Sequence, residues 1–99
     1  MWQVKIDDAA AKVFESDELS PDDRIVIQKW AQTVVKHGPE ALKLKPTVWA
    51  DHELYGEWRG YRASSFSYKG RIIYKVEDKK VTVVVVKITT DHDYKRRGE

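Results

Sequence analysis

The second half of the chain contains a nearly continuous apolar run, Val81-Thr82-Val83-Val84-Val85-Val86. Such a run is typical of a central β-strand that is covered on both faces, because a strand with one wet face alternates apolar and polar residues. We assign residues 81–88 to this strand. A sheet built around it must be covered by a second layer, and helices elsewhere in the chain can supply that layer. The run therefore predicts a layered α+β domain.

Three further segments have the composition of strands. Residues 2–6 alternate apolar and polar side chains, whereas residues 58–66 and 71–76 are rich in aromatic and β-branched side chains. Turn-forming residues separate the later segments at positions 69–70 and 77–80. We therefore expect one short strand at the N-terminus and three consecutive strands in the second half.

Two helices are predicted between the first strand and the others. Residues 9–15 form an alanine-rich stretch that follows Asp7 and Asp8, and acidic residues at a helix start are favoured by the helix dipole. Residues 20–23, Ser-Pro-Asp-Asp, supply an N-cap, a proline at the first helical position and two carboxylates in the first turn. Residues 37–39, His-Gly-Pro, end that second helix. The predicted fold is α+β, with two N-terminal helices packed on one face of a small, mostly antiparallel four-stranded sheet in the order β-α-α-β-β-β.

A length of 99 residues predicts one domain, which spans residues 1–99. The sequence has no cysteine, which excludes a disulfide, a thiolate zinc site and a cysteine nucleophile. No apolar stretch approaches the roughly 20 residues that a membrane span needs, and the N-terminus lacks the apolar core of a signal peptide. We therefore expect a cytoplasmic protein with no membrane partner.

Charge is divided unevenly along the chain. Residues 1–54 hold seven Lys and Arg against ten Asp and Glu, whereas residues 55–99 hold eleven against six. The basic half also carries much of the aromatic content. Cations that contact phosphates and rings that stack on bases are typical of nucleic-acid-binding surfaces, although many solvated surfaces have a similar composition. The pattern favours an anionic partner such as nucleic acid.

Three residues of the basic half are predicted to meet at one edge of the sheet. If the last two strands form a hairpin about residues 78–79, the numbers of paired residues sum to 157, so that Arg71 faces Val86. His92 and Tyr94 follow the end of the last strand. The hairpin therefore brings the loop that carries them to the edge where Arg71 lies.

An Arg, a His and a Tyr at one rim have the chemistry for transesterification of RNA. One group must take the proton from the 2′-hydroxyl, another must protonate the leaving 5′ oxygen, and a cation must stabilise the phosphorane charge. Histidine titrates near neutral pH, and arginine offers a planar fork to phosphate oxygens. The alternative is structural: Arg71 is then a surface cation and Tyr94 packs beneath the C-terminal residues.

Other chemistries have less support in the sequence. His37 lies at a predicted helix end, where a cation suits the dipole. Residues 51–53 and 91–93 offer mixed oxygen and nitrogen donors for a metal, but neighbouring strand residues point to opposite faces. No glycine-rich phosphate loop and no Gly-x-Ser-x-Gly elbow is present. We expect neither a metal nor a cofactor.

Several motifs resemble the RelE/ParE superfamily of bacterial type II toxins, in particular its RelE, YoeB and YafQ branches. Residues 51–62, DHELYGEWRGYR, are similar to the Asp-His-x-Leu-x-Gly pattern and the following Gly-x-Arg of YafQ-like members. Residues 70–76, GRIIYKV, resemble the Arg-Leu/Ile-Val/Ile-Tyr-x-Val strand of RelE and YoeB. His92 and Tyr94 resemble the C-terminal His or Tyr acid/base positions of these toxins. In element order the resemblance covers nearly the whole chain.

The resemblance implies a metal-independent endoribonuclease that cuts mRNA in the ribosomal A site and is inhibited by a cognate antitoxin protein. Arg71 matches the family's transition-state cation and is implied to clamp the phosphate. His92 is implied to donate or accept a proton, and Tyr94 to act as a second acid/base or positioning group. The residues implied to bind RNA are Arg62, Lys69, His52, Arg59, Lys95 and Arg96.

Two other functions fit the same fold. A ParE-like toxin would inhibit DNA gyrase without cleaving RNA, although members of that branch generally lack the His and Arg constellation. A non-catalytic module would keep the fold and bind an antitoxin through it.

Overall fold

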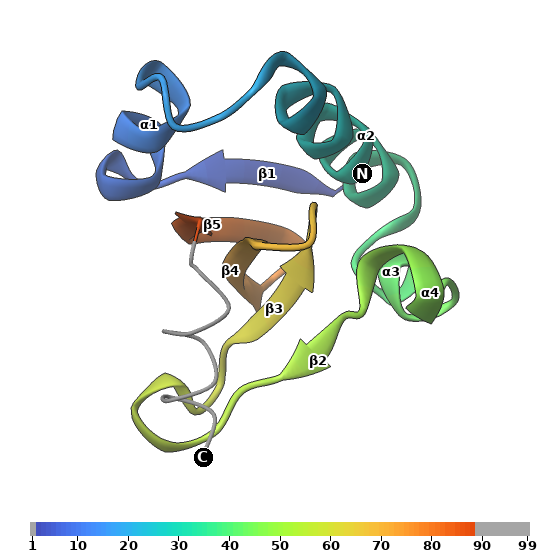
Figure 1. Cartoon of the computed structure of the whole chain (residues 1–99). Coiled ribbons are helices and arrows are strands. Elements are labelled where there is room, and N and C mark those ends of the chain that lie inside the picture. Colours follow the sequence, from blue (N-terminus) through green and yellow to red (C-terminus); the bar gives the residue numbers. More distant parts are fainter. Residues whose placement is uncertain (1, 89–99) are drawn as a thin grey trace.

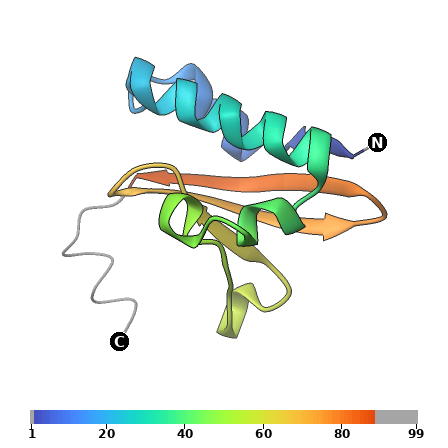
Figure 2. The ribbon, with the colours of Figure 1, turned by 90° about the vertical axis from the view of Figure 1, so that its right-hand side faces the viewer.

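The part of the chain that the structure describes forms a five-stranded sheet with α1 and α2 across one of its faces (Figures 1 and 2). The computed structural model describes residues 2–88. The strand order is β1-β5-β4-β3-β2, and β1 runs parallel to β5 while the other neighbours are antiparallel. The elements are β1 (Gln3–Ile6), α1 (Asp8–Glu15), α2 (Pro21–His37), α3 (Glu40–Lys43), α4 (Pro46–Trp49), β2 (His52–Glu53), the 3₁₀ helix η1 (Gly56–Trp58), β3 (Arg62–Ser65), β4 (Gly70–Glu77) and β5 (Lys80–Ile88).

The predicted α+β fold and the order of its main elements are confirmed. The sheet gains a fifth strand, because the two-residue β2 pairs antiparallel with β3. The strand predicted over residues 58–66 is shorter, since β3 begins only at Arg62. Gly56 and Gly60 have φ angles of 68° and 93°, which turn the chain out of an extended path and leave the intervening residues to η1. The short helices α3 and α4 were not expected from the sequence.

Helix α2 begins and ends at the predicted signals. The Ser20 hydroxyl accepts a hydrogen bond from the Asp23 backbone N–H at 3.0 Å, and the Asp23 carboxylate accepts one from the Ser20 N–H at 3.1 Å. This reciprocal capping box stabilises a helix start by about 1 kcal/mol. Gly38 ends α2 with a φ of +81°, and a Cβ there would lie 2.6 Å from the Trp2 indole nitrogen. Glycine is therefore required both by the backbone and by the packing of Trp2.

The core lies between α1, α2 and the sheet face that they cover. Trp30 of α2 and Tyr74 of β4 are almost fully buried and pack edge to face, with ring centroids 5.3 Å apart. Residues of β4 and β5 that alternate along each strand complete this face, including Ile72 and Val86. Among residues 2–88, no helix combines the length and the apolar character that crossing a membrane requires.

The β4–β5 hairpin turns at the predicted residues. Asp78 and Lys79 have φ angles of 47° and 62°. Positive φ at both central residues is the property of a two-residue type I′ turn, whose twist matches that of the flanking strands. The turn sets the register in which β4 and β5 begin to pair.

Candidate functional site

The sheet face turned away from α1 and α2 carries the candidate site, and we call it the distal face. Because Ile72 and Tyr74 point into the core, the alternate residues Arg71, Ile73 and Lys75 of β4 point to the distal face. Across the sheet, Arg71 pairs with Ser65 of β3 and with Lys87 of β5. These three side chains therefore share one row of the distal face.

Arg71 is anchored by the turn between β3 and β4. Its Nη1 donates hydrogen bonds to the carbonyl oxygens of Ser67, Tyr68 and Gly70, at 3.2, 3.2 and 2.9 Å. The turn itself is tight, since a Cβ at Gly70 would lie 2.3 Å from the Phe66 ring. A half-buried guanidinium held by main-chain carbonyls keeps a fixed orientation at the edge of the distal face.

The register beside Arg71 differs from the predicted one. Pairs near the turn obey the expected sum of 157, as in Tyr74 with Val83, but the register shifts between Ile73 and Tyr74, and Ile73 pairs with Val85. Val84 is thus an extra residue in β5, which makes a β-bulge. Arg71 consequently faces Lys87, and the prediction that it faces Val86 is wrong.

The bulge decides which side chains reach the distal face. Without the extra residue, Val86 would lie beside Arg71 and Lys87 would point into the core, because a shift of one residue exchanges the faces. With it, Val86 is buried in the core at 4% exposure, and Lys87 joins Arg71. The bulge therefore keeps Lys87 out of the core and puts it opposite Arg71 in the ladder.

More cations lie on the distal face toward the other end of the sheet. The ladder pairs Lys5 of β1 with Thr82 of β5, and Thr82 with Lys75 of β4, so both lysines share a row there. Lys75 forms an ion pair with Glu77 at 3.6 Å. Within the described strands, Glu77 is the acidic residue at a distal-face position of β1, β4 and β5. A face with this charge balance attracts anions.

A polar network lies on the opposite face, in the core. The Asp51 side chain has no solvent exposure, and its Oδ1 accepts hydrogen bonds from Arg62 Nε at 2.8 Å and Nη2 at 2.7 Å. Its Oδ2 accepts from the Ser64 hydroxyl at 2.6 Å and from the Tyr74 hydroxyl. Ser64 in turn accepts from the Trp30 indole N–H at 3.0 Å. The network joins β3, β4 and α2 to the segment that precedes β2.

The network raises the pKa of two of its members, Tyr74 and Arg62. Burial raises the pKa of the Tyr74 phenol well above its usual value, and its hydrogen bond to Asp51 adds to the increase. Burial alone would lower the pKa of Arg62, but the hydrogen bonds and charge of Asp51 outweigh it and raise that pKa. At neutral pH, Tyr74 is therefore a neutral donor and Arg62 a permanent cation, both directed at Asp51.

The described residues of the predicted RNA-binding set lie in different surroundings. Arg62 is 18% exposed and is bound to Asp51, with Glu53 3.8 Å from its Nη1. His52 is exposed in β2, where its Nδ1 lies 2.9 Å from the Ala50 carbonyl oxygen. Arg59 is exposed and lines a hollow of about 650 Å³ formed by residues of the 53–62 segment. Lys69 is exposed in the turn that anchors Arg71.

The remaining predicted site residues, His92, Tyr94, Lys95 and Arg96, lie outside the described residues. The last described residue, Ile88, pairs with Gly70, the neighbour of Arg71. Ile88 therefore lies beside the strand position next to Arg71, and His92 follows it by four residues in the sequence.

Sequence reasoning missed Lys87 on the distal face and the structural role of Asp51 in the core. Lys87 was overlooked because the bulge that brings it to Arg71 lies within a run of valines, which carries no local signal. Asp51 was considered only as a metal ligand or a motif residue, whereas its carboxylate is enclosed by Arg62, Ser64 and Tyr74. Within residues 2–88, no cluster of three or more His, Cys, Asp or Glu side chains could hold a metal ion.

The fold is similar to that of bacterial toxins of known structure. A copper-bound mutant toxin from Helicobacter pylori matches with a TM-score of 0.73 and 23% identity, over 89% of this chain and 94% of that one. YafQ from E. coli matches with a TM-score of 0.72 and 18% identity, over 90% of this chain and 94% of that one.

Complexes of two such toxins match as well. YoeB in a heterotetrameric YoeB-YefM toxin–antitoxin complex from Staphylococcus aureus has a TM-score of 0.67 and 14% identity, over 91% of this chain and 99% of that one, and the E. coli DinJ-YafQ complex also matches. No family model and no curated protein matches the sequence. The comparisons confirm, for the fold, the resemblance to RelE/ParE-superfamily toxins that the motifs indicated.

Proposed function

We propose that this protein is the toxin of a type II toxin–antitoxin pair and that it is an endoribonuclease acting on mRNA. The fold it shares with YafQ and YoeB supports the toxin role, and both of those proteins occur in complexes, with DinJ and YefM. The partners are then a cognate antitoxin protein and mRNA bound in the ribosomal A site. Because ribosomes and mRNA are its targets, the protein acts in the cytoplasm.

One observation carries the catalytic part of the proposal. The Arg71 guanidinium is held by three main-chain carbonyls, and Arg71 is the ladder partner of Lys87, so both residues are on the distal face. Two cations at adjacent ladder positions provide charge where a phosphodiester develops it during cleavage. A guanidinium carries five N–H donors in a planar fork, which suits it to the oxygens of a phosphate.

The reaction is an internal transesterification of RNA. The 2′-oxygen attacks the adjacent phosphorus, its proton passes to a base, and the bond from phosphorus to the 5′-oxygen breaks as an acid protonates that oxygen. The products are a 2′,3′-cyclic phosphate and a 5′-hydroxyl end. Because RNA supplies its own nucleophile, the step requires no metal-activated water.

Each candidate residue has a part in this step. Arg71, with Lys87 beside it, holds the scissile phosphate and stabilises the extra charge of the phosphorane. His92 donates or accepts the proton, and Tyr94 acts as the second acid/base group or positions the nucleotide. His52, Arg59 and Lys69, together with Lys95 and Arg96, contact the backbone on either side.

Arg62 has a different part from the one that the motif implied. Its guanidinium is bound through two nitrogens to the buried Asp51, and Glu53 lies near the third. A cation compensated in this way contributes little net charge to RNA. We infer that Arg62 supports β3 and the segment before β2, and that it acts on the substrate only through that support.

The test is primer extension on mRNA after induction of the wild type, Arg71→Ala, His92→Ala and, as a matched control, Lys12→Ala on the exposed surface of α1. We expect new 5′ ends and growth arrest with the wild type and Lys12→Ala, and neither with the other two variants. Thermal denaturation of the purified variants must show that they are folded. Full toxicity in both Arg71→Ala and His92→Ala would remove the mechanism.

The same experiment discriminates the other functions. Intact mRNA together with gyrase-dependent DNA breaks would indicate a ParE-like gyrase inhibitor. A wild type without effect on growth, still able to bind an antitoxin, would indicate a non-catalytic module. Either result would overturn the nuclease proposal.

A further inference from the structure

The loop between β2 and β3 forms the hollow of about 650 Å³ that Arg59 lines, and we call it the loop hollow. Its lining comes entirely from residues 53–62. In Figures 1 and 2 this loop, which contains η1, projects from the sheet away from α1 and α2. The loop hollow is therefore separated by the sheet from the helical layer, and it lies toward the side of the distal face.

Main-chain hydrogen bonds give the loop a fixed shape. The Leu54 N–H donates to the Tyr61 carbonyl at 2.9 Å, and the Tyr61 N–H donates to the Trp58 carbonyl at 2.9 Å. Gly56 and Gly60 line the loop hollow, and a Cβ at either position would meet no atom within 4 Å apart from its chain neighbours. The hollow therefore has open space beside a closed backbone, so a ligand can enter without rearranging the loop.

Aromatic side chains gather at the loop hollow. Tyr55 lines it and is 78% exposed, which is unusual for so large a ring. Tyr61 also lines it, and the Trp58 ring packs edge to face against Tyr61, with centroids 5.3 Å apart and planes at 87°. Trp58 thus holds Tyr61 in place, while Tyr55 presents its ring to solvent. Exposed rings of this kind are the surfaces on which unpaired bases stack.

The charged residues of the lining have different availability. Arg62 is bound to the buried Asp51, whereas Arg59 is exposed and takes part in no salt bridge within residues 2–88. Glu53 is the acidic residue of the lining, and its 66% exposed side chain lies 3.8 Å from Arg62. Arg59 can therefore contact a phosphate, and the Glu53 carboxylate can accept hydrogen bonds from a ligand.

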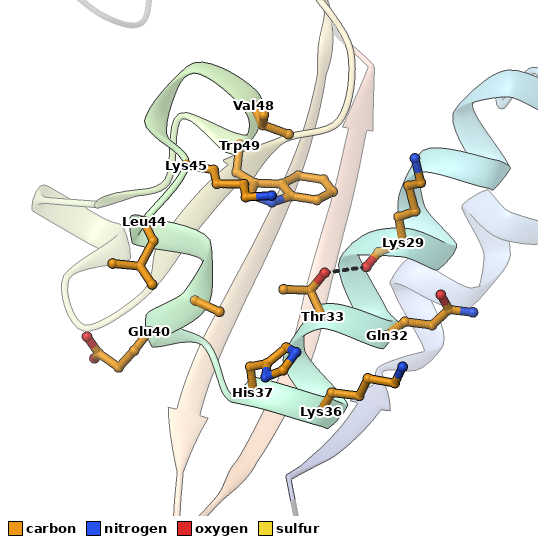
Figure 3. A pocket seen from close by; sticks show the side chains of 11 residues that line it. Lys29, Gln32, Thr33, Lys36, His37, Glu40, Leu44, Lys45, Val48 and Trp49 are labelled. Atoms are coloured by element: carbon orange, nitrogen blue, oxygen red, sulfur yellow. Dashed lines mark hydrogen bonds between the residues drawn. The ribbon is translucent and has the colours of Figure 1, made fainter.

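A second hollow, of about 800 Å³ between α2 and the short helices α3 and α4, is less suited to a base (Figure 3). The indole ring in its lining, that of Trp49, is only 5% exposed. Its exposed apolar side chains are aliphatic, with Leu44 at 79% and Val48 at 55% exposure. The combination of an exposed aromatic ring with an available cation therefore favours the loop hollow.

We propose that the loop hollow binds one nucleotide of a single-stranded RNA and selects guanine. The base stacks on Tyr55 against the Tyr61 side of the hollow, Arg59 contacts the phosphate of that nucleotide, and Glu53 accepts hydrogen bonds from the base edge. The inference rests on the proposed function in taking mRNA as the strand that is bound. It adds a site that recognises a base, away from the residues that cleave.

The selection of guanine follows from the donors on its edge. Guanine presents two adjacent donors, N1–H and the N2 amine, which match the two oxygens of a carboxylate in a bidentate pair. Adenine and cytosine place a ring-nitrogen acceptor beside their amine, and uracil flanks its single N–H with two carbonyl oxygens. Each of these acceptors would repel one oxygen of Glu53, so guanine is the base that fits.

The loop hollow lies within reach of a strand that is held at Arg71. Strand β3 begins at Arg62, whose ladder partner Tyr74 is three positions, or about 10 Å, from Arg71 along β4. Lys75, the next residue, is on the distal face and offers a cation along this path. An RNA with its scissile phosphate at Arg71 therefore reaches the loop hollow within a few nucleotides.

The probes are fluorescent oligonucleotides of about five nucleotides with 2′-O-methyl groups, which lack the nucleophile and stay intact. Four strands carry guanine, adenine, cytosine or uracil at the centre of a uridine background, and a fifth is a sugar–phosphate strand without bases. Anisotropy with the full-length protein gives the affinities. We expect the guanine strand to bind at least about fivefold more tightly than the other base-containing strands, and the strand without bases to bind most weakly.

Variants of the stacking ring locate the bound base. We expect Tyr55→Ala to weaken binding of the guanine strand at least about fivefold, whereas Tyr55→Phe keeps the ring and should bind within about twofold of the wild type. Leu44→Ala, at a residue of equal exposure in the second hollow, is the matched control and should have no effect. Thermal denaturation should give the same midpoint for all of them, because both positions are exposed.

Variants of the charged residues separate base recognition from charge. Glu53→Gln removes a negative charge, so every strand should bind more tightly, but the preference for guanine should fall to below about twofold. A role of Glu53 in the fold alone would leave that preference unchanged. Arg59→Ala should make the slope of log K against log salt shallower by about 0.7, the share of one phosphate contact, whereas Lys12→Ala on α1 should not.

The binding assay can contradict each part of the proposal. Equal binding of the guanine strand and the strand without bases would show that the protein recognises charge alone. Wild-type affinity in Tyr55→Ala would place the base elsewhere. Equal binding of all four base-containing strands, or a guanine preference that survives Glu53→Gln, would remove Glu53 as the group that selects the base.

Primer extension keeps this proposal separate from the nuclease proposal. Wild-type cuts should have guanine at a fixed distance from the cleaved bond, and Tyr55→Ala should cut without that preference. Cleavage by the wild type together with base-independent oligonucleotide binding would remove the loop-hollow proposal alone. Guanine-selective binding that depends on Tyr55, in a wild type that does not cleave mRNA, would remove the nuclease proposal alone.

Discussion

Arg71 and Lys87 are ladder partners on β4 and β5, so two basic residues occupy opposite positions on neighbouring strands. Like charges at such positions destabilise a sheet by roughly 0.2–1 kcal/mol compared with neutral residues. The bulge at Val84 creates the pair, and the same bulge keeps Lys87 out of the core. An anion bound between the two side chains would turn their repulsion into a shared attraction, and the proposed phosphodiester substrate would supply such an anion.

Replacing Lys87 by glutamine should therefore weaken RNA binding without weakening the fold. We expect Lys87→Gln to raise the free energy of unfolding slightly, by up to about 0.5 kcal/mol. In filter binding with single-stranded RNA, the slope of log K against log salt should become shallower by about 0.7, the contribution of one lost phosphate contact. Lys12→Gln on α1 is the control, and an equal slope for Lys87→Gln and this control would place Lys87 outside the RNA-binding surface.

The buried carboxylate of Asp51 should contribute strongly to stability. In Asp51→Asn, Arg62 faces a neutral amide in place of a carboxylate. The side chain also has one oxygen acceptor fewer for the hydroxyls of Ser64 and Tyr74. Breaking a buried ion pair from one side costs about 3–5 kcal/mol, and we expect a loss of about 3 kcal/mol in urea denaturation because Arg62 retains some exposure.

A second carboxylate near Arg62 provides the matched control for Asp51→Asn. Glu53 lies 3.8 Å from Arg62 Nη1 and its side chain is 66% exposed. We expect Glu53→Gln to change the free energy of unfolding by less than about 0.5 kcal/mol. If the two substitutions cost the same, the enclosure of Asp51 is not what stabilises this region.

Local patterns were sufficient to predict helices α1 and α2 and the long strands β4 and β5. The N-cap at Ser20 and the glycine at position 38 act within a few residues, so the bounds of α2 follow from the sequence. The β4–β5 turn was predictable for the same reason. In each case, backbone conformation is decided by neighbours in the chain rather than by distant contacts.

The site required information that no local pattern contains. Any of the consecutive valines in β5 can be the bulged residue, because all have the same strand propensity and size, so the pairing of Arg71 with Lys87 could not be read from the sequence. The enclosure of Asp51 depends on donors 11 to 23 residues away, from two strands. His92 and Tyr94 stay predictions, since they lie outside the described residues.

The contact between Gly70 and Phe66 should hold the turn that anchors Arg71. A methyl group at Gly70 would lie within 2.3–2.7 Å of three Phe66 ring carbons, so Gly70→Ala must displace the ring or the strand. We expect a loss of about 1–3 kcal/mol in urea denaturation, the usual cost of overpacking. Cleavage should fall as well, because the Gly70 carbonyl is one of the three that hold Arg71.

A double-mutant cycle separates this steric effect from a backbone effect. In a Phe66→Leu background, the smaller side chain leaves room for the added methyl group. The cost of Gly70→Ala should then shrink by at least about 0.5 kcal/mol, as expected for two residues in contact. Strictly additive costs would contradict the proposed clash.

Tyr74 should make stability depend on pH in the alkaline range. Its phenol has a raised pKa in the folded protein, through burial and through donation to Asp51, whereas in the unfolded chain it titrates near 10. Above pH 10 the unfolded state therefore loses this proton first and binds fewer protons than the folded state, so the free energy of unfolding falls as pH rises. The slope from this one group approaches about −1.4 kcal/mol per pH unit, and its contribution is fully present below pH 10.

Tyr74→Phe isolates that contribution from the other groups that titrate at high pH. At neutral pH the variant should be less stable by about 1–2 kcal/mol, because Asp51 loses a donor while the ring still fills the core. Urea denaturation from about pH 8 to about pH 11 should then show the wild type losing its advantage as the pH passes 10, since only the wild type can release the Tyr74 proton on unfolding. Parallel curves for the two proteins would mean that the Tyr74 hydroxyl has the same pKa in the folded and unfolded states. That result would contradict the pKa increase expected from its burial and its hydrogen bond to Asp51.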